Sequence, residues 1–470
     1  MTAYHDARAT VTSAAYDAQV GRFLATYNPN LRTVVLIPGG MGSQLDRSPS
    51  PFRPPAELPL GRFDPVWMDF GILFTAEARD LAIDARGHDA GDHVIVANGP
   101  LRFIVYGYPY ERTRLWAADS MLNYVVFGYD WRRPVTEAAA WLDTFLRRCR
   151  DRVAGKHPGH TMDDVTLLAH SQGGLVATMY LHKRFRRAAT SADVDAAGIG
   201  RVVTVGTPFF SAATNIFRYF QGQEPLNAIY GAADLARIAG SLPGPYILNA
   251  PAADLFKAAF PGDDYPVTDD TTGQPLDLHD DAVATQRLPP WFDRDHMQAA
   301  RREKRLLCRE LPAPVAERLW HIRSGLGEGA VTRLRWTAPA RPINAYRPGR
   351  DDLPFVEVAG AGDGTVPFWA AALPQNKGRT YDCVTADEHT TLAEHDEPLR
   401  VVRSIIETAH LPRASVVANA LTPEPKPVRA SAAVVARLCQ EIGDRTAGRD
   451  DPRLQDRAVW RRLFEEAHLC

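Results

Sequence analysis

The residues best suited to covalent chemistry lie in one short segment, Thr166–Leu175. There an apolar run ends in Ala-His-Ser-Gln-Gly, with Ser171 at its centre, and a helical pattern follows. This order predicts a nucleophile elbow, in which a sharp turn between a strand and a helix lifts the serine hydroxyl out of the sheet. The residues two before and two after the serine must be small, because strand and helix close on them. Ala169 and Gly173 meet that need, although the motif usually has glycine at the first position.

A serine hydroxyl becomes a nucleophile at neutral pH when a base removes its proton and an acid orients that base. A strand predicted at 381–384 leads to His389, the candidate base. His395 is the alternative, but its flanking residues are typical of the start of a surface helix, which favours His389. The candidate acid is Asp363, which follows the apolar run at 354–358 and stands among glycines. Taken alone, this aspartate would also suit an ordinary turn.

The tetrahedral intermediate of acyl transfer needs two N–H donors for its negatively charged oxygen. One donor is the N–H of Gln172, the residue after the nucleophile. The other lies in the loop that follows the apolar run at 33–37, at Gly40 or Met41. Gly39 and Gly40 let that backbone approach closely. A simple strand-to-helix turn is the alternative interpretation of this loop.

Composition narrows the class of protein. The chain has 470 residues, of which 45% are hydrophobic and 23% charged, which suits a globular protein with a sizeable core. The net charge of −2 gives no reason to expect a nucleic-acid partner. Five widely spaced cysteines without a C-x-x-C pair argue against a disulfide framework or a zinc site. No secretory signal and no run of about 18 apolar residues is visible, so we expect reduced thiols and a cytoplasmic location.

Strand-like and helix-like patterns alternate along much of the chain. This alternation predicts an α/β fold, with a mostly parallel central sheet and helices on both faces. The runs that predict strands lie at 33–37, 94–96, 103–106, 124–127, 165–169 and 201–205. The patterns that predict helices lie at 135–153, directly after Ser171, and at 398–410.

The stretch from residue 211 to residue 345 differs from the rest of the chain. It has scattered aromatic residues, many prolines and no clear strand alternation, which predicts a cap inserted over one end of the sheet. The expected domains are a leader at 1–30, the first part of the core at 31–210, the cap insertion at 211–345, the second part of the core with the acid and the histidine at 346–410, and a linker with a helical tail at 411–470.

Five blocks of sequence resemble a known family. They are the segments 37–45, 66–69, Tyr129–Arg132 with its sequence Tyr-Asp-Trp-Arg, and the surroundings of Ser171 and Asp363. Together they resemble the lecithin:cholesterol acyltransferase family, which includes lysosomal phospholipase A2 and the phospholipid:diacylglycerol acyltransferases. A departure is that no cysteine occurs before position 149, whereas many members of that family carry a disulfide-closed lid loop.

The resemblance implies an α/β-hydrolase fold with a helical cap. It places the catalytic triad at Ser171, Asp363 and His389, and the oxyanion donors at Gly40 and Gln172, in agreement with the assignment from spacing. In the Tyr-Asp-Trp-Arg block, we expect an aspartate–arginine pair and a tryptophan that fix the loop beside the elbow. Trp67 is expected in the core rather than in an acyl groove, although the resemblance implies that this region lies near the acyl pocket.

The expected function is a serine-dependent lipid acyl-ester hydrolase or O-acyltransferase that acts through an acyl-Ser171 intermediate. Its partner is an acyl lipid, with transient contact to a membrane surface, and it requires no metal or organic cofactor. A non-lipid serine carboxylesterase or thioesterase on the same fold is the alternative. The choice between hydrolysis and transfer, the acyl acceptor and the oligomeric state stay open at this stage.

Overall fold

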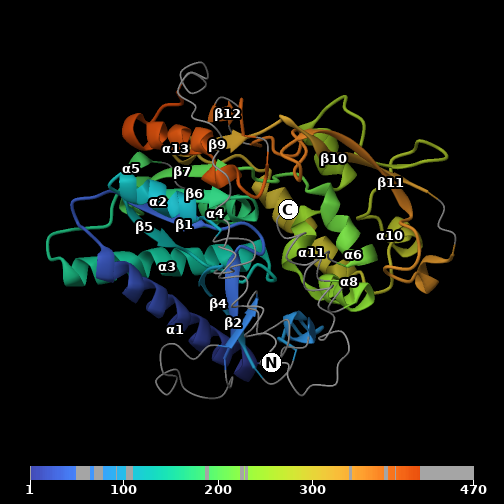
Figure 1. Cartoon of the computed structure of the whole chain (residues 1–470), viewed down its shortest axis with the longest axis horizontal. Helices are drawn as coiled ribbons and strands as arrows, with labels where there is room; N and C mark the ends of the chain where they lie inside the picture. Colours follow the sequence, from blue (N-terminus) through green and yellow to red (C-terminus); the bar gives the residue numbers. More distant parts are fainter. Residues whose placement is uncertain are drawn as a thin grey trace, which may run out of the picture.

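The computed structural model describes residues 2–48, 64–67, 78–90, 93–101, 109–185, 190–222, 227, 231–337, 341–374, 379–386 and 388–412. Its centre is a six-stranded sheet in the order β12-β9-β7-β6-β1-β5, in which all neighbouring strands are parallel (Figure 1). The strands are β1 (Thr33–Ile37), β5 (Asn123–Val126), β6 (Val165–His170), β7 (Ile199–Val205), β9 (Leu319–Arg323) and β12 (Thr380–Asp382).

Helices cover both faces of this sheet, as the sequence predicts. Successive residues of β1 point to opposite faces, so Val35 and Ile37 join one core cluster while Val34 and Leu36 join another. The first cluster includes residues of α1 (Thr2–Thr26), α3 (Val135–Lys156) and α4 (Gln172–Arg184); the second includes residues of α13 (Asp396–Thr408) and packs against α2 (Glu111–Asp119). Figure 1 shows α3 and α13 on opposite sides of the strands.

The N-terminal segment is more regular than the expected leader. It forms the single helix α1, whose residues Tyr16, Val20 and Phe23 are buried in the main core. Nearby, a small antiparallel sheet has the order β3-β2-β4, with β2 (Ser43–Arg47), β3 (Asp64–Trp67) and β4 (Ile95–Pro100). The strand predicted at 94–96 corresponds to β4, whereas the one at 103–106 lies outside the described residues.

After β7 the chain leaves the central sheet and forms the segment that the sequence predicts as a cap, which Figure 1 shows to one side of the strands. The boundary expected at residue 345 differs from the structure, because β9 lies within 211–345 and pairs with β7 in the central sheet. The first four residues of this short strand are all buried, so it lacks the alternation that marks a half-exposed strand. The described helical elements between β7 and β9 are η3 (Ala213–Phe217), α6 (Arg218–Gln221), α8 (Ala232–Ser241), η4 (Gly244–Leu248), α9 (Ala253–Ala259), α10 (Asp281–Arg287), α11 (Arg294–Leu307) and α12 (Ala313–Ala316), whereas the short helix α5 (Ser191–Ala196) precedes β7.

The run at 354–358, which the sequence places in the second part of the core, does not join the central sheet. It belongs to β11 (Phe355–Gly362), which pairs antiparallel with β10 (Gly327–Trp336) in a separate sheet of order β11-β10-β8. The third strand is β8 (Val267–Asp269), which like β10 lies within the stretch 211–345 that the sequence predicts as the cap. The predicted tail lies outside the described residues from position 413 onward. Within the described part of the chain, every helix is too short or too polar to traverse a lipid bilayer.

Candidate active site

Ser171 lies in a strained turn between β6 and α4. Its backbone has φ 52° and ψ −127°, in a region that residues with a side chain seldom adopt. The turn is crowded, because a Cβ at Gly173 would collide with the carbonyl oxygens of Ile37 and Pro38. Ala169, by contrast, is accommodated with its side chain fully buried. The segment thus has the geometry of a nucleophile elbow, with alanine in place of the usual first glycine.

The structure brings the three predicted residues of the triad together. The Ser171 Oγ lies 2.8 Å from Nε2 of His389, and Nδ1 of His389 lies 2.7 Å from Oδ2 of Asp363. A carboxylate only accepts hydrogen bonds, so Nδ1 of His389 carries the proton and Nε2 is free to accept from the serine hydroxyl. This arrangement fits a base that removes the serine proton.

Asp363 is held as an anion at the end of β11. Its side chain is 2% exposed, and Oδ1 accepts the N–H groups of Val366 at 2.7 Å and Thr365 at 3.1 Å. Burial by itself raises the pKa of this carboxyl, but His389 and the two N–H groups outweigh it, so the pKa lies below its usual value. The acid therefore follows a strand of the separate sheet β11-β10-β8, not a strand of the central sheet.

His389 rather than His395 faces the nucleophile. The backbone N–H of His389 donates to the carbonyl of Asp363 at 2.8 Å, which fixes the histidine loop on the acid. His395 is the N-cap of α13 and its Nδ1 accepts the N–H of Glu397 at 3.4 Å. The helix start expected at His395 is thus present, although the residue is partly buried.

Gly206 is a functional position that the sequence interpretation missed. It follows β7 (Ile199–Val205) directly and has φ 58°, and a Cβ there would stand 3.2 Å from Oδ2 of Asp363 and 3.4 Å from Nδ1 of His389. It would also come within 2.9 Å of Leu392. The residue is therefore glycine both for its backbone conformation and for the space that the acid and the histidine occupy. Its place after a buried strand was the one local signal.

The loop after β1 runs beside the elbow. A Cβ at Gly39 would lie 3.0 Å from the Cβ of Ser171, and one at Gly40 would meet the side chain of Gln172. The N–H of Gln172 is the first of α4, so it has no partner within the helix. The loop thus brings Gly39 against Ser171 and Gly40 against the side chain of Gln172, so the two predicted oxyanion donors, Gly40 and Gln172, lie close together beside the nucleophile. Met41, the alternative donor, has φ 66° and its carbonyl accepts from Trp67 Nε1 at 2.8 Å.

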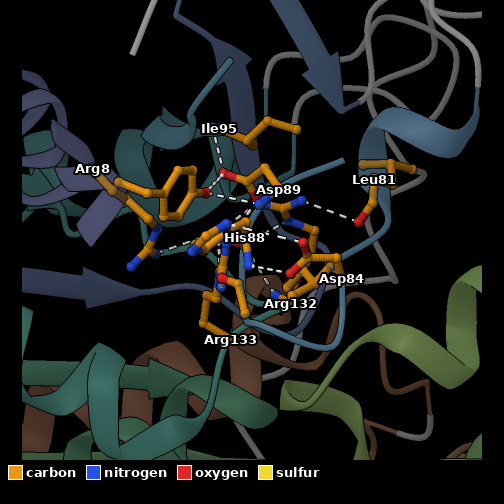
Figure 2. Close-up of polar contacts among 12 residues, drawn as sticks. Arg8, Leu81, Asp84, His88, Asp89, Ile95, Arg132 and Arg133 are labelled. Atoms are coloured by element: carbon orange, nitrogen blue, oxygen red, sulfur yellow. Dashed lines mark hydrogen bonds and ion pairs between the residues drawn. The ribbon is translucent and has the colours of Figure 1, made fainter. Parts of the chain in front are cut away.

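The Tyr-Asp-Trp-Arg block forms a buried ion network (Figure 2). Arg132 donates to Asp130 through Nε at 2.9 Å and Nη2 at 2.8 Å, and Nη2 also lies 2.8 Å from Oδ1 of Asp89. Arg133 Nη2 reaches the same oxygen at 2.8 Å. The predicted aspartate–arginine pair is confirmed, and Asp89 is a further member that the sequence did not reveal.

An apolar pocket adjoins the loop at Gly40 and Met41. Trp67 and Trp131 pack edge to face in its wall, with ring centroids 5.1 Å apart, so both are buried and also line the pocket. The pocket is half-open, and its empty space amounts to about 510 Å³ when the open solvent at its mouth is counted. The remaining lining residues are Leu81, Asn215, Arg218, Tyr219, Gly222, Leu235, Ile238, Ala239, Leu242 and Pro245.

Among the residues that the structure describes, no group of three or more His, Cys, Asp or Glu residues is arranged to hold a metal ion. Cys149, Cys308 and Cys383 are free thiols. Burial raises the pKa of the Cys149 thiol to about 12, which keeps it protonated and unreactive.

One comparison with a solved structure supports this architecture. A chain of the Tle4-Tli4 complex superposes with a TM-score of 0.51 at 14% identity, covering 81% of this chain and 99% of that one. The mature Bacillus licheniformis lipase BlEst2 gives a TM-score of 0.32 at 12% identity, over 81% and 93% of the two chains, which is too low to establish a shared fold. No protein-family model and no curated protein matches the chain.

The parallel sheet, the covering helices and the elbow define the class of protein: this chain has the α/β-hydrolase fold. The predicted fold class is thereby confirmed. The finer resemblance to the lecithin:cholesterol acyltransferase family stays a prediction from the five sequence blocks.

Proposed function

We propose that this protein is a serine-dependent acyl-ester hydrolase or O-acyltransferase that acts on lipids. The observation that carries the proposal is the continuous hydrogen-bonded sequence from Ser171 through His389 to Asp363. In the first step Nε2 of His389 takes the hydroxyl proton while Oγ bonds to the ester carbonyl carbon. The N–H groups of Gly40 and Gln172 hold the negatively charged oxygen of the resulting intermediate.

The intermediate then breaks its bond to the alcohol oxygen. His389 returns the proton to that oxygen, the alcohol leaves, and the acyl group stays on Ser171. In the second half, a water or a second alcohol gives its proton to His389 and attacks the acyl carbon. Release restores the Ser171 hydroxyl and yields a free fatty acid from water or a new ester from an alcohol. Both halves use side chains and backbone groups alone.

The pocket beside the oxyanion loop supports a lipid rather than a polar acyl group. Met41 belongs to the loop and lines the pocket, so an ester bound at Ser171 has apolar surface next to it. Trp67, Leu235 and Leu242 contribute further apolar wall. Burial of an acyl chain against such surface is favourable by about 25 cal/mol per Å². This observation favours a lipase or phospholipase over the alternative carboxylesterase or thioesterase.

The side chain of Arg218 favours a phospholipid over other lipid esters as the substrate. Of the described residues that line the pocket, it is the one that carries a charge, and no described carboxylate pairs with it. Burial lowers the pKa of Arg218, and the neighbouring Tyr219 opposes this. A guanidinium in apolar surroundings favours an anionic ligand, and its planar fork matches phosphate oxygens. A glycerophospholipid carries such a group a few bonds from its acyl ester, whereas a neutral glyceride does not.

Product analysis tests the proposed function. Purified protein is incubated with phosphatidylcholine vesicles that contain diacylglycerol, and lipids are identified by mass spectrometry. We expect free fatty acid, a new triacylglycerol, or both, and none of these from the Ser171→Ala variant. Fatty acid alone assigns hydrolysis, and a new ester assigns transfer. Activity confined to short-chain p-nitrophenyl esters would instead support the non-lipid esterase, and no activity on any ester would refute the proposal.

A further inference from the structure

Three hydrogen bonds connect the oxyanion loop to the histidine loop through the elbow. The N–H of Gly39 donates to the Tyr110 hydroxyl at 2.7 Å, and this hydroxyl lies 2.9 Å from Nδ1 of His170. Nε2 of His170 lies 2.8 Å from the carbonyl oxygen of His389. Tyr110 and His170 are 6% and 4% exposed, so bulk water does not compete for these bonds.

The direction of each bond follows from the groups involved. A carbonyl oxygen only accepts, so Nε2 of His170 carries the proton and Nδ1 accepts from the Tyr110 hydroxyl. The hydroxyl oxygen in turn accepts the N–H of Gly39. Burial, followed by the nearby His389, lowers the pKa of His170 to about 3, so its ring is neutral at physiological pH. Every donor in the chain therefore has an acceptor, and one tautomer satisfies them all.

Tyr110 is itself anchored to the segment that follows His389. It is the N-cap of α2, and the Thr113 hydroxyl in the first turn of this helix donates to the carbonyl of Ala393 at 2.9 Å. The N–H of Arg112 donates to the Glu394 carboxylate at 3.0 Å. The start of α2 thus holds the histidine loop from a second direction.

We infer that Tyr110 and His170 are positioning residues that fix the oxyanion loop and His389 relative to Ser171. This inference rests on the proposed function, because these positions affect catalysis only if Ser171 is the nucleophile. His170 precedes Ser171 directly, and Gly39 precedes the oxyanion donor Gly40, so each bond of the chain adjoins a group that serves the reaction. Displacement of such groups by about 1 Å is enough to slow a reaction a hundredfold.

The Tyr110→Phe variant tests this role, because it removes the hydroxyl and keeps the ring. The matched control is Tyr124→Phe, whose buried hydroxyl has no hydrogen-bond partner within the described part of the chain. With p-nitrophenyl butyrate, we expect kcat of Tyr110→Phe to fall about tenfold with KM within twofold of wild type. The rate of inactivation by a fluorophosphonate should fall in parallel, while Tyr124→Phe keeps wild-type values for all three.

A double-mutant cycle with His170→Gln separates a shared role from two independent packing effects. If the two residues act as one chain, the double variant is no slower than His170→Gln alone. Multiplied losses in the double variant, or wild-type kcat and inactivation rate in Tyr110→Phe, would overturn the inference. Wild-type protein that neither hydrolyses the ester nor reacts with the fluorophosphonate would instead refute the proposed function, so the two failures are distinct. Circular dichroism and thermal unfolding verify that each variant is folded.

Discussion

Arg132 and Asp89 form an ion pair in which neither side chain is exposed to solvent, with 2.8 Å between Nη2 and Oδ1. The other carboxylate oxygen of Asp89 accepts the N–H of Ile95 at 2.8 Å and the Tyr4 hydroxyl at 2.7 Å. Burial alone raises the pKa of Asp89, but Arg132 and Arg133 outweigh it and hold the pKa well below its usual value. The pair therefore joins α1, β4 and the loop before α3 at one point (Figure 2).

Asp89→Asn should destabilise the protein strongly, because it leaves the buried guanidinium of Arg132 with less compensating charge. We expect the free energy of unfolding in urea to fall by about 3–5 kcal/mol. The control is Asp234→Asn, which alters an exposed pair with Arg237 at 3.4 Å and should cost less than about 1 kcal/mol. Equal losses in the two variants would contradict a structural role for the buried network.

Gly206→Ala should impair catalysis more than stability. The new methyl group would press on Asp363 and His389, so we expect kcat on p-nitrophenyl butyrate to fall about a hundredfold. Gly262→Ala is the control, because Gly262 also has positive φ, at 96°, but a Cβ there would meet nothing within 4 Å. An alanine at positive φ costs about 1 kcal/mol of stability in both variants, but Gly262→Ala should keep wild-type kcat. Similar kcat in both variants would count against the close approach at Gly206.

Arg218→Met should change substrate preference. Methionine fills similar space in the pocket but lacks the cation, so kcat/KM for phosphatidylcholine in mixed micelles should fall about 10- to 100-fold relative to that for diacylglycerol. Arg237→Met on the neighbouring α8 controls for a general loss of positive charge from the cap and should leave the ratio unchanged. If Arg218→Met leaves the ratio of the two kcat/KM values unchanged, Arg218 does not bind the phosphate of the substrate.

The stability of the protein should depend on pH through the protonation of the Glu394 carboxyl group. Burial raises its pKa to about 7, despite the opposing N–H of Arg112. Between the usual value near 4.5 and pH 7 the unfolded chain releases this proton while the folded protein keeps it, so stability falls as pH rises through this range, by about 3 kcal/mol.

Urea unfolding at pH 5 and pH 8 measures this effect. Glu394→Gln keeps an acceptor for the N–H of Arg112 but cannot titrate, so it should lose less stability than wild type between the two values. Glu407→Gln, on the exposed end of α13, should keep the wild-type dependence. A Glu394→Gln variant with the wild-type dependence would show that another group is responsible.

The parts of the fold that the sequence predicts are those with local signals. β1 and β6 are mostly apolar, fully buried runs followed by glycine-containing segments, so their position and the elbow at Ser171 follow directly. The sequence does not predict β9, because Trp320 and His321 interrupt its run of aliphatic residues, although most of the strand is buried. β11 is recognisable as a strand, but nothing local shows that it pairs with β10 rather than with the central sheet.

The candidate site divides in the same way. Ser171, Asp363 and His389 stand in turns after strand-like runs, where residue type and chain order are informative. Tyr110 and Gly206 act through contacts with residues far away in the chain: Tyr110 lies 60 positions from His170. No local pattern encodes such a contact, so these residues are visible only once the chain is folded.

The most direct test of the central claim is the site at which a fluorophosphonate attaches to the wild-type protein. The reagent is allowed to react to completion, esterase activity is followed, and the modified peptide is identified by mass spectrometry. The account predicts one adduct per chain, on Ser171, formed in step with the loss of activity and absent from His389→Ala at the same exposure. An adduct on a different residue, or full esterase activity in protein modified at Ser171, would contradict it.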